Sequence, residues 1–236
     1  MPQLRNAPTV KRDTAVNILD TAERLCGLHG IESVSVRDIA TEAGVSIAVI
    51  YHHYGSKANL LLAILNSRFL EVRTEFDTLI GELQSRPTPA VRDIIRAVLQ
   101  PMNRWRRPDR EAALQFYALA LVCPLPPLRE AIDSGVVGLR RVVELLQRAL
   151  PRLTHEDVCW RLHFTMKISH QTSWDTTRLG ILSEGNCHSD DPEESLARGI
   201  AFAEGAFLAP PFVYTAKAAA GRVKPKRRRQ PRPPAP

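Results

Sequence analysis

Residues 34–54 read VSVRDIATEAGVSIAVIYHHY and contain the clearest local pattern in the chain. Ser35 is followed three residues later by Asp38, which is the spacing of a capping box at the start of a helix. Gly44 is the residue type that most often ends a helix in a turn. The stretch therefore predicts a short capped helix over residues 36–43.

A second short helix is expected directly after the turn, over residues 47–53. Ser46 stands at its N-cap, and Val45 and Ile50 occupy the positions of a hydrophobic staple. Two short helices joined by a tight glycine turn form the plan of a helix-turn-helix. The exposed start of the second helix could then enter the major groove of DNA. The same pattern also occurs in helical bundles that bind no DNA.

The residues that follow favour a nucleic-acid partner. Tyr51, His52, His53 and Lys57 stand around the end of the second helix and the start of the next one. Hydroxyl, ring N–H and ammonium groups beside a helix N-terminus are suited to a phosphate backbone.

Helical spacing of apolar residues extends over almost the whole chain, and no alternation typical of strands persists. We therefore expect an all-α fold of about nine helices. A first helix over 14–29 would precede the motif, and a long helix over 57–83 would follow it. Further helices are expected over 89–105, with Pro101 kinking or splitting it, and over 109–122, 128–150, 154–183 and 192–209.

Positive charge is concentrated at the C-terminal end of the chain. The formal net charge is +7, and residues 217–236 hold eight basic residues and no acidic one, so residues 1–216 carry −1. This Pro- and Arg-rich tail is expected to be disordered. It could add nonspecific affinity for DNA or have no role.

Several classes of function are disfavoured. The sequence has no G-x-S-x-G, P-loop or H-E-x-x-H motif, and its four cysteines lie far apart, so we expect no enzyme, no catalytic residues, no cofactor and no metal site. The longest charge-free stretch, residues 112–128, is too short and too broken by prolines to span a bilayer. The expectation is a soluble, cytoplasmic protein with no membrane partner.

The segment VRDIATEAGVS…IYHHYGSKANLL resembles the DNA-binding domain of the TetR family of bacterial transcriptional regulators. The resemblance covers about residues 12–72, and it implies an effector-responsive homodimer, usually a repressor, that binds a double-stranded DNA operator and a small molecule. It divides the chain into a DNA-binding domain at 12–72, with its helix-turn-helix at 35–54, a ligand-binding and dimerisation domain at 73–216, and the tail at 217–236. The alternative is an effector-binding helical protein with weak or lost operator recognition.

The resemblance also implies roles for single residues. Ser46, Ile47 and Ala48 would face the groove, while Tyr51, His53 and Lys57 would hold phosphates. Arg37 would touch the backbone or a base edge, and His52 could reach either. Two positions depart from the family pattern: Val49 stands where Thr or Ser is common, and Ile47 where a polar residue is frequent. Ile47 would favour contacts with thymine methyl groups, unless it points inward and packs.

The C-terminal two-thirds suggests a pocket and a dimer interface. An apolar effector cavity could be lined by Trp105, Phe116, Tyr117 and Phe164. The helix expected at 154–183 is apolar almost all round, and the one at 192–209 carries a stripe of small residues, so these two would form the dimer interface. One side of the former carries His163, Lys167, His170 and Trp174, which would bind an acidic effector or, as we favour, make polar contacts at the dimer seam.

Overall fold

The structure, a computed structural model, describes residues 8–172, 176–187 and 191–212. Within these ranges it is all-helical and contains no strand, which confirms the expected fold class. The basic tail lies outside the described residues. The elements are α1 (Pro8–His29), α2 (Val36–Glu42), α3 (Ile47–Tyr54), α4 (Lys57–Gln84), α5 (Val91–Arg104), the 3₁₀ helix η1 (Pro108–Arg110), α6 (Glu111–Val122), α7 (Pro126–Val137), α8 (Arg140–Ala149), α9 (His155–Thr172), α10 (Thr176–Leu182) and α11 (Pro192–Leu208).

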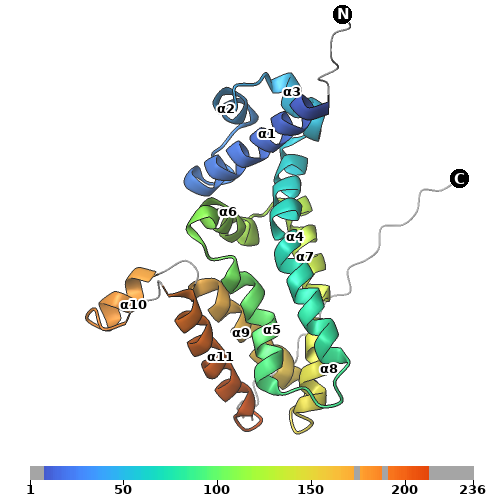
Figure 1. Cartoon of the computed structure of the whole chain (residues 1–236), viewed down its shortest axis with the longest axis vertical. Coiled ribbons are helices and arrows are strands. Elements are labelled where there is room, and N and C mark those ends of the chain that lie inside the picture. The colour runs from blue at the N-terminus through green and yellow to red at the C-terminus, as the bar shows by residue number, and fades with distance from the viewer. Residues whose placement is uncertain (1–7, 173–175, 188–190, 213–236) are drawn as a thin grey trace, which may run out of the picture.

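The helices form two groups that are joined by one long helix. The short helices α2 and α3 lie with α1 at one end, and α4 runs from there along the length of the molecule (Figure 1). Helices α5, α8, α9 and α11 gather at the other end, and α10 projects from their side (Figure 1).

The first hydrophobic core lies beneath the helix-turn-helix. Ile18, Ile39, Ile50 and Leu60 come from α1 to α4 and are buried in it. The same core includes Phe116 of α6, because α6 packs closely along α1. The expected domain boundary near residue 72 falls inside α4, and the division into domains stays a prediction.

The second core is built from α5, α8, α9, α11 and the last part of α4. Its centre contains Ile94, Val142 and Phe207. Arg161 of α9 holds the end of α11, because its guanidinium donates to four carbonyl oxygens in the last turn of the helix and directly after it, where carbonyls lack helical partners. These acceptors are the carbonyls of Ala206, Phe207, Ala209 and Pro210, at 2.6–3.0 Å.

The helix count is higher than expected because two of the predicted helices are interrupted. The stretch 128–150 forms α7 and α8, which separate at Gly138. Both pack on α4, but α7 also packs on α6, whereas α8 packs on α5 and α9. The stretch 154–183 forms α9 and α10. In contrast, Pro101 lies buried inside a continuous α5. Among the described helices, none alone is long and apolar enough to cross a membrane; only the pair Pro108–Val122 and Pro126–Ala149, bent by 97°, passes that test together.

Candidate nucleic-acid interface

The start of α2 is fixed by the predicted capping box. The amide of Asp38 donates to the hydroxyl oxygen of Ser35 at 3.2 Å, and the amide of Ser35 donates to the carboxylate of Asp38 at 2.8 Å. The Ser35 hydroxyl donates to the same carboxylate at 2.6 Å. These hydrogen bonds, from the side chain first and then from the backbone, lower the pKa of Asp38, so the box is complete at neutral pH.

The turn between α2 and α3 is a Schellman motif. The amide of Gly44 donates to the carbonyl of Thr41 at 3.3 Å, and the amide of Val45 donates to the carbonyl of Ala40 at 3.0 Å. Gly44 has a φ of +67°, in the left-handed region that favours glycine. Asn17 of α1 adds a hydrogen bond to the carbonyl of Ala43 at 3.0 Å. The angle between the two motif helices is thereby set by backbone geometry.

Helix α3 presents one side to the core and the other to solvent. Ile50 is buried, and half-buried Val49 packs against the same core, which explains why an apolar residue suits position 49. Ile47 is 40% exposed, and Ala48 is exposed beside it. The alternative that Ile47 packs inward therefore does not hold.

Ser46 occupies the N-cap position of α3 without acting as the expected cap. Its backbone is extended there, but its side chain accepts no hydrogen bond from the helix. The first amides of α3 thus keep their hydrogen-bonding capacity at an exposed helix N-terminus, where the helix dipole favours an anion. The hydroxyl of Ser46, itself exposed, lies at the same point.

The far end of α3 is attached to α1 and to the loop before α2. The hydroxyl of Tyr54 donates to the carbonyl of Ala15 at 2.8 Å, and burial raises its pKa. The ammonium of Lys57 donates to the carbonyl of Ile31 at 2.6 Å. Lys57 therefore has a structural partner that the resemblance did not imply, although two of its three N–H groups remain for another acceptor.

The remaining predicted contact residues lie on the exposed side of the motif. Arg37, Tyr51 and His52 are exposed, and His53 is half-buried. The rings of His52 and His53 meet edge to face, with centroids 5.6 Å apart. The structure thus brings all eight predicted DNA-contact residues to α2, α3 and the start of α4, but leaves their contacts with DNA a prediction.

Arg68 ties α1 to α4 and was missed at the level of sequence. Its guanidinium bonds Glu23 at 2.5 Å and also pairs with Asp20. Burial raises the pKa of Glu23, although its ion pair with Arg68 acts in the opposite direction. Partial burial lowers the pKa of Arg68, but the two carboxylates outweigh this effect and raise it. The ion pairs tie α1, on which α2 packs, to the long helix.

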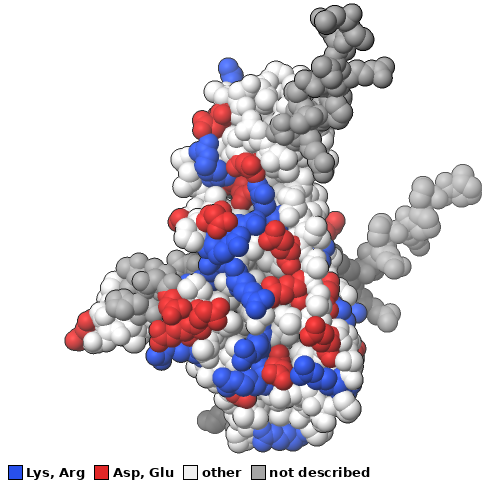
Figure 2. Space-filling model, in the orientation of Figure 1, with Lys and Arg blue, Asp and Glu red and all other residues white. Residues whose placement is uncertain are grey.

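Charge is not strongly one-sided around the motif. Residues 1–60 contain six basic and six acidic residues, and Arg24 is already paired with Glu42. On the face seen in Figure 2, basic and acidic side chains alternate over the middle of the molecule, while the end formed by α1 to α3 carries few of them. The net charge of this region therefore does not attract DNA, and any attraction must come from where its individual basic side chains lie.

Three of the predicted effector residues lie together in the first core. Trp105 and Tyr117 pack on Phe69, whose ring centroid lies 4.6 Å from that of Trp105 and 4.2 Å from that of Tyr117. Phe116 belongs to the same core and is fully buried in α6. Burial raises the pKa of Tyr117 to about 12. The guanidinium of Arg110 lies 5.5 Å from the Trp105 ring centroid. The indole N–H of Trp105 is buried and has no hydrogen-bond acceptor within the described residues.

Phe164 does not join these three aromatics, contrary to the expected cavity lining. It is 56% exposed and stacks on Trp160, because the buried side of α9 is formed by residues such as Leu162 that enter the second core. Other small or apolar side chains are exposed on the neighbouring α11. The outward-facing set Trp160, Phe164, Ala197, Ala201, Phe202 and Gly205 is called the α9–α11 face below.

The other residues predicted on this side of α9 are only partly described. His163 and Lys167 are exposed, and the His163 ring lies 5.8 Å from that of Phe164. The side chain of His170 and the whole of Trp174 lie outside the described residues, so their roles stay predictions.

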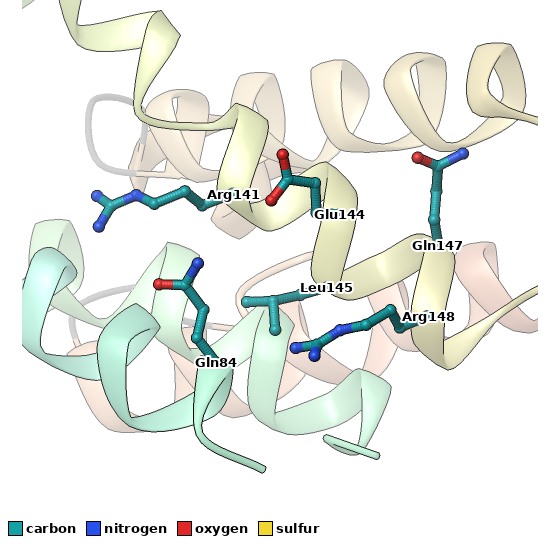
Figure 3. A pocket seen from close by; sticks show the side chains of 6 residues that line it. All are labelled: Gln84, Arg141, Glu144, Leu145, Gln147 and Arg148. Atoms are coloured by element: carbon teal, nitrogen blue, oxygen red, sulfur yellow. The ribbon is translucent and has the colours of Figure 1, made fainter. Parts of the chain in front are cut away.

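A hollow of about 430 Å³ lies elsewhere, between the end of α4 and α8. Gln84 comes from α4 and the other five side chains from α8, as Figure 3 shows. Arg141 at its edge is paired with Asp77 and lies over the ring of Phe76. No sequence motif marks this place. Its lining is Gln84, Arg141, Glu144, Leu145, Gln147 and Arg148.

The fold and this site define a class of protein: an all-helical chain with an N-terminal helix-turn-helix and a second helical core. Two family profiles match the chain, that of the bacterial regulatory proteins of the tetR family over residues 18–64 and that of the tetracyclin repressor-like C-terminal domain over residues 96–206. The chain belongs to the TetR family.

Curated relatives match over part of the chain. The HTH-type transcriptional regulator BetI of Agrobacterium fabrum is 43% identical over 58 residues, which are 25% of this chain and 28% of that protein. BetI of Brucella anthropi is 32% identical over 120 residues, 51% of this chain and 59% of that protein. The chain thus matches between about a quarter and three-fifths of the length of these relatives.

Solved structures agree over a longer span. A TetR-family regulator from Streptomyces coelicolor has a TM-score of 0.56 at 23% identity and covers 83% of this chain and 95% of its own. NalD, the secondary repressor of the MexAB-OprM multidrug efflux pump in Pseudomonas aeruginosa, has a TM-score of 0.53 at 18% identity, with 82% and 96% covered. At these identities the likeness establishes the fold.

Proposed function

We propose that the chain is a sequence-specific DNA-binding transcriptional regulator, acting as an effector-responsive homodimeric repressor in the cytoplasm. The observation that carries this proposal is the exposed N-terminal edge of α3, where Ser46, Ile47 and Ala48 project from a helix whose other side is locked by Ile50. Relatives named as HTH-type transcriptional regulators support the activity, and the repressor NalD supports its direction.

The exposed groups suggest how DNA would be bound. The Ser46 hydroxyl and the first amides of α3 would meet a phosphate or a base edge, and Arg37 and Tyr51 would contact the backbone. Ile47 and Ala48 would read thymine methyl groups in the major groove. Replacing contacted thymines by uracil should therefore weaken binding.

The α9–α11 face is the proposed dimer interface. Trp160, Phe164 and Phe202 are each more than half exposed in the single chain, and Trp160 stacks on Phe164. Large exposed apolar side chains of this kind are typical of a contact site. Ala197, Ala201 and Gly205 are small, so two copies of α11 could approach closely. A twofold axis here would present two α3 helices to successive turns of the duplex.

The effector site is proposed to adjoin the aromatic cluster of Phe69, Trp105 and Tyr117. A ligand with a hydrogen-bond acceptor would satisfy the buried indole N–H of Trp105. A regulator from Saccharomonospora viridis, similar in fold with a TM-score of 0.50, was solved in complex with choline, which supports small-molecule binding as a class. Because α6 carries Tyr117 and packs on α1, a ligand that moves α6 would move the DNA-binding unit.

A binding experiment with a matched control tests DNA recognition. The full chain would select duplexes from a random pool, and affinity for the selected sequence would be measured by fluorescence anisotropy at several salt concentrations. Arg37→Ala is expected to weaken binding about fivefold to twentyfold and to lower the salt slope by about one. Arg73→Ala removes an exposed arginine of α4 and is expected to change neither quantity.

Failure of the selection would favour the alternative reading. If the wild-type chain enriches no sequence and binds all duplexes alike, it is an effector-binding helical protein without operator recognition. In either case we propose that it acts by binding and not by catalysis, as regulators of this family generally do.

A further inference from the structure

The helix α10 and the turn after it, residues 176–187, stand apart from both cores. Figure 1 shows α10 projecting from the side of the molecule that α11 forms. No other helix of the described chain packs against it beyond isolated residue pairs. A seven-residue helix gains little stability by itself in water, so α10 needs a partner.

The turn gives this segment a defined shape in spite of its isolation. The amide of Gly185, whose φ is +83°, donates to the carbonyl of Gly180 at 2.8 Å. The amide of Cys187 donates to the hydroxyl of Ser183 at 2.8 Å. The end of α10 is thus closed by its own hydrogen bonds.

Those side chains are apolar and exposed. Leu179 is 37% exposed, Ile181 74% and Leu182 83%. Three large aliphatic residues on one short projecting helix form a surface that water solvates poorly. Exposed apolar surface of this kind is typical of a contact site.

The position of α10 points to a second copy of this chain as the cover. In sequence, α10 lies between the two helices of the α9–α11 face, and in Figure 1 it projects beside α11, one of those two helices. The aromatics Trp160, Phe164 and Phe202 would bury on the order of 300–450 Å² if fully covered. A stable interface needs about 800 Å² on each partner, so the α9–α11 face gains from an added apolar element.

We propose that α10 is an arm that packs on the partner's copy of the α9–α11 face. The inference rests on the proposed homodimer and adds a second contact to it. Because a twofold interface is self-complementary, each arm contributes once on each side of the axis. Ile181 and Leu182, the most exposed of the three, would enter the partner's surface.

Sedimentation equilibrium of the full chain tests the arm. The double variant Ile181→Gln, Leu182→Gln is expected to raise the dimer dissociation constant at least tenfold. The control Leu70→Gln alters an aliphatic residue of α4 that is 60% exposed, and it should change the constant less than threefold. Circular dichroism should give the same helix content for all three proteins, because none of these side chains is buried.

A cross-linking experiment identifies what the arm touches. A benzophenone side chain at position 182 would be activated by light in a mixture of two differently tagged copies. A cross-link from one copy to α9 or α11 of the other supports the arm, whereas cross-links confined to one chain overturn it. A wild-type chain that stays monomeric overturns the proposed homodimer as well, while a dimer unchanged by the double variant overturns the arm alone.

Discussion

The two cores of the molecule differ in how completely one chain closes them. Around the first core, the large apolar residues that the motif exposes are Ile47 and Tyr51, set among polar side chains. Over the second core, Trp160, Phe164 and Phe202 are exposed together on adjacent helices. The first surface is suited to a polar, hydrated partner, and the second to a permanent one. The proposed homodimer would cover the second surface and leave the first free for DNA.

The largest effect is expected from placing negative charge on the α9–α11 face. The double variant Phe164→Glu, Phe202→Glu would bury unpaired carboxylates in the proposed interface, at a cost of several kcal/mol. We expect the dimer dissociation constant to rise at least a hundredfold in sedimentation equilibrium, and operator affinity to fall with it because both half-sites must be held together.

The control places a carboxylate over the first core. Leu28 of α1 is 58% exposed, and Leu28→Glu should leave the dimer constant unchanged. If both proteins dimerise like the wild type, the α9–α11 face is not the interface and the contrast between the cores is wrong.

The pH dependence of stability tests whether the first core is closed around Cys26. Burial raises the pKa of the Cys26 thiol from 9.0 to about 11, with nearby Lys57 opposing the shift and Cys123 adding to it. Between these pH values the folded chain keeps a proton that the unfolded chain loses, so the free energy of unfolding falls as pH rises. The loss should reach about 2–3 kcal/mol above pH 11.

Urea unfolding of three proteins between pH 8 and 11 would measure this effect. Cys26→Ala should show a shallower fall in stability with pH than the wild type, whatever its stability at pH 8. Cys187→Ala, which alters an exposed thiol, should follow the wild-type curve. Parallel curves for all three would mean that Cys26 is not buried in the folded protein.

The sequence predicted those features that depend on neighbouring residues. Ser35 and Asp38 form their capping box, and Gly44 makes the turn, because each involves atoms only a few residues apart. The break at Gly138 could not be read from spacing, since the apolar period continues across it, whereas α7 and α8 share only α4 as a neighbour and otherwise pack on different helices. Contacts between residues far apart in the sequence, such as the ion pairs of Arg68, were not predicted either.

The candidate site shows the same division. The position of α3 and the exposure of its first residues followed from the motif, whereas the bond from Lys57 to Ile31 joins residues 26 apart in the chain. Phe164 was assigned to a cavity, and the structure places it elsewhere. The helical spacing of an aromatic residue does not indicate which side of the helix the fold will bury. Only the packing of α9 on the second core decides that it faces outward.

The smallest expected effect concerns the contact by which α6 adjoins the DNA-binding unit. Gly27 and Gly81 each lie in the last turn of a helix, where replacing glycine by alanine gains up to about 1 kcal/mol. At Gly81 an added Cβ meets nothing within 4 Å, so Gly81→Ala should raise the free energy of unfolding. At Gly27 the Cβ would lie 3.0 Å from the backbone oxygen of Ala112 in α6, which cannot move without shifting its helix.

Gly27→Ala should therefore forfeit that gain and lower stability by about 1 kcal/mol, in keeping with the cost of overpacking. Urea unfolding at one pH compares the two variants directly. Equal stabilisation by both would show that α1 and α6 are not in close contact, and that the first core is closed by α1 to α4 without α6. A loss confined to Gly27→Ala would instead identify this contact as the place where movement of α6 must displace α1.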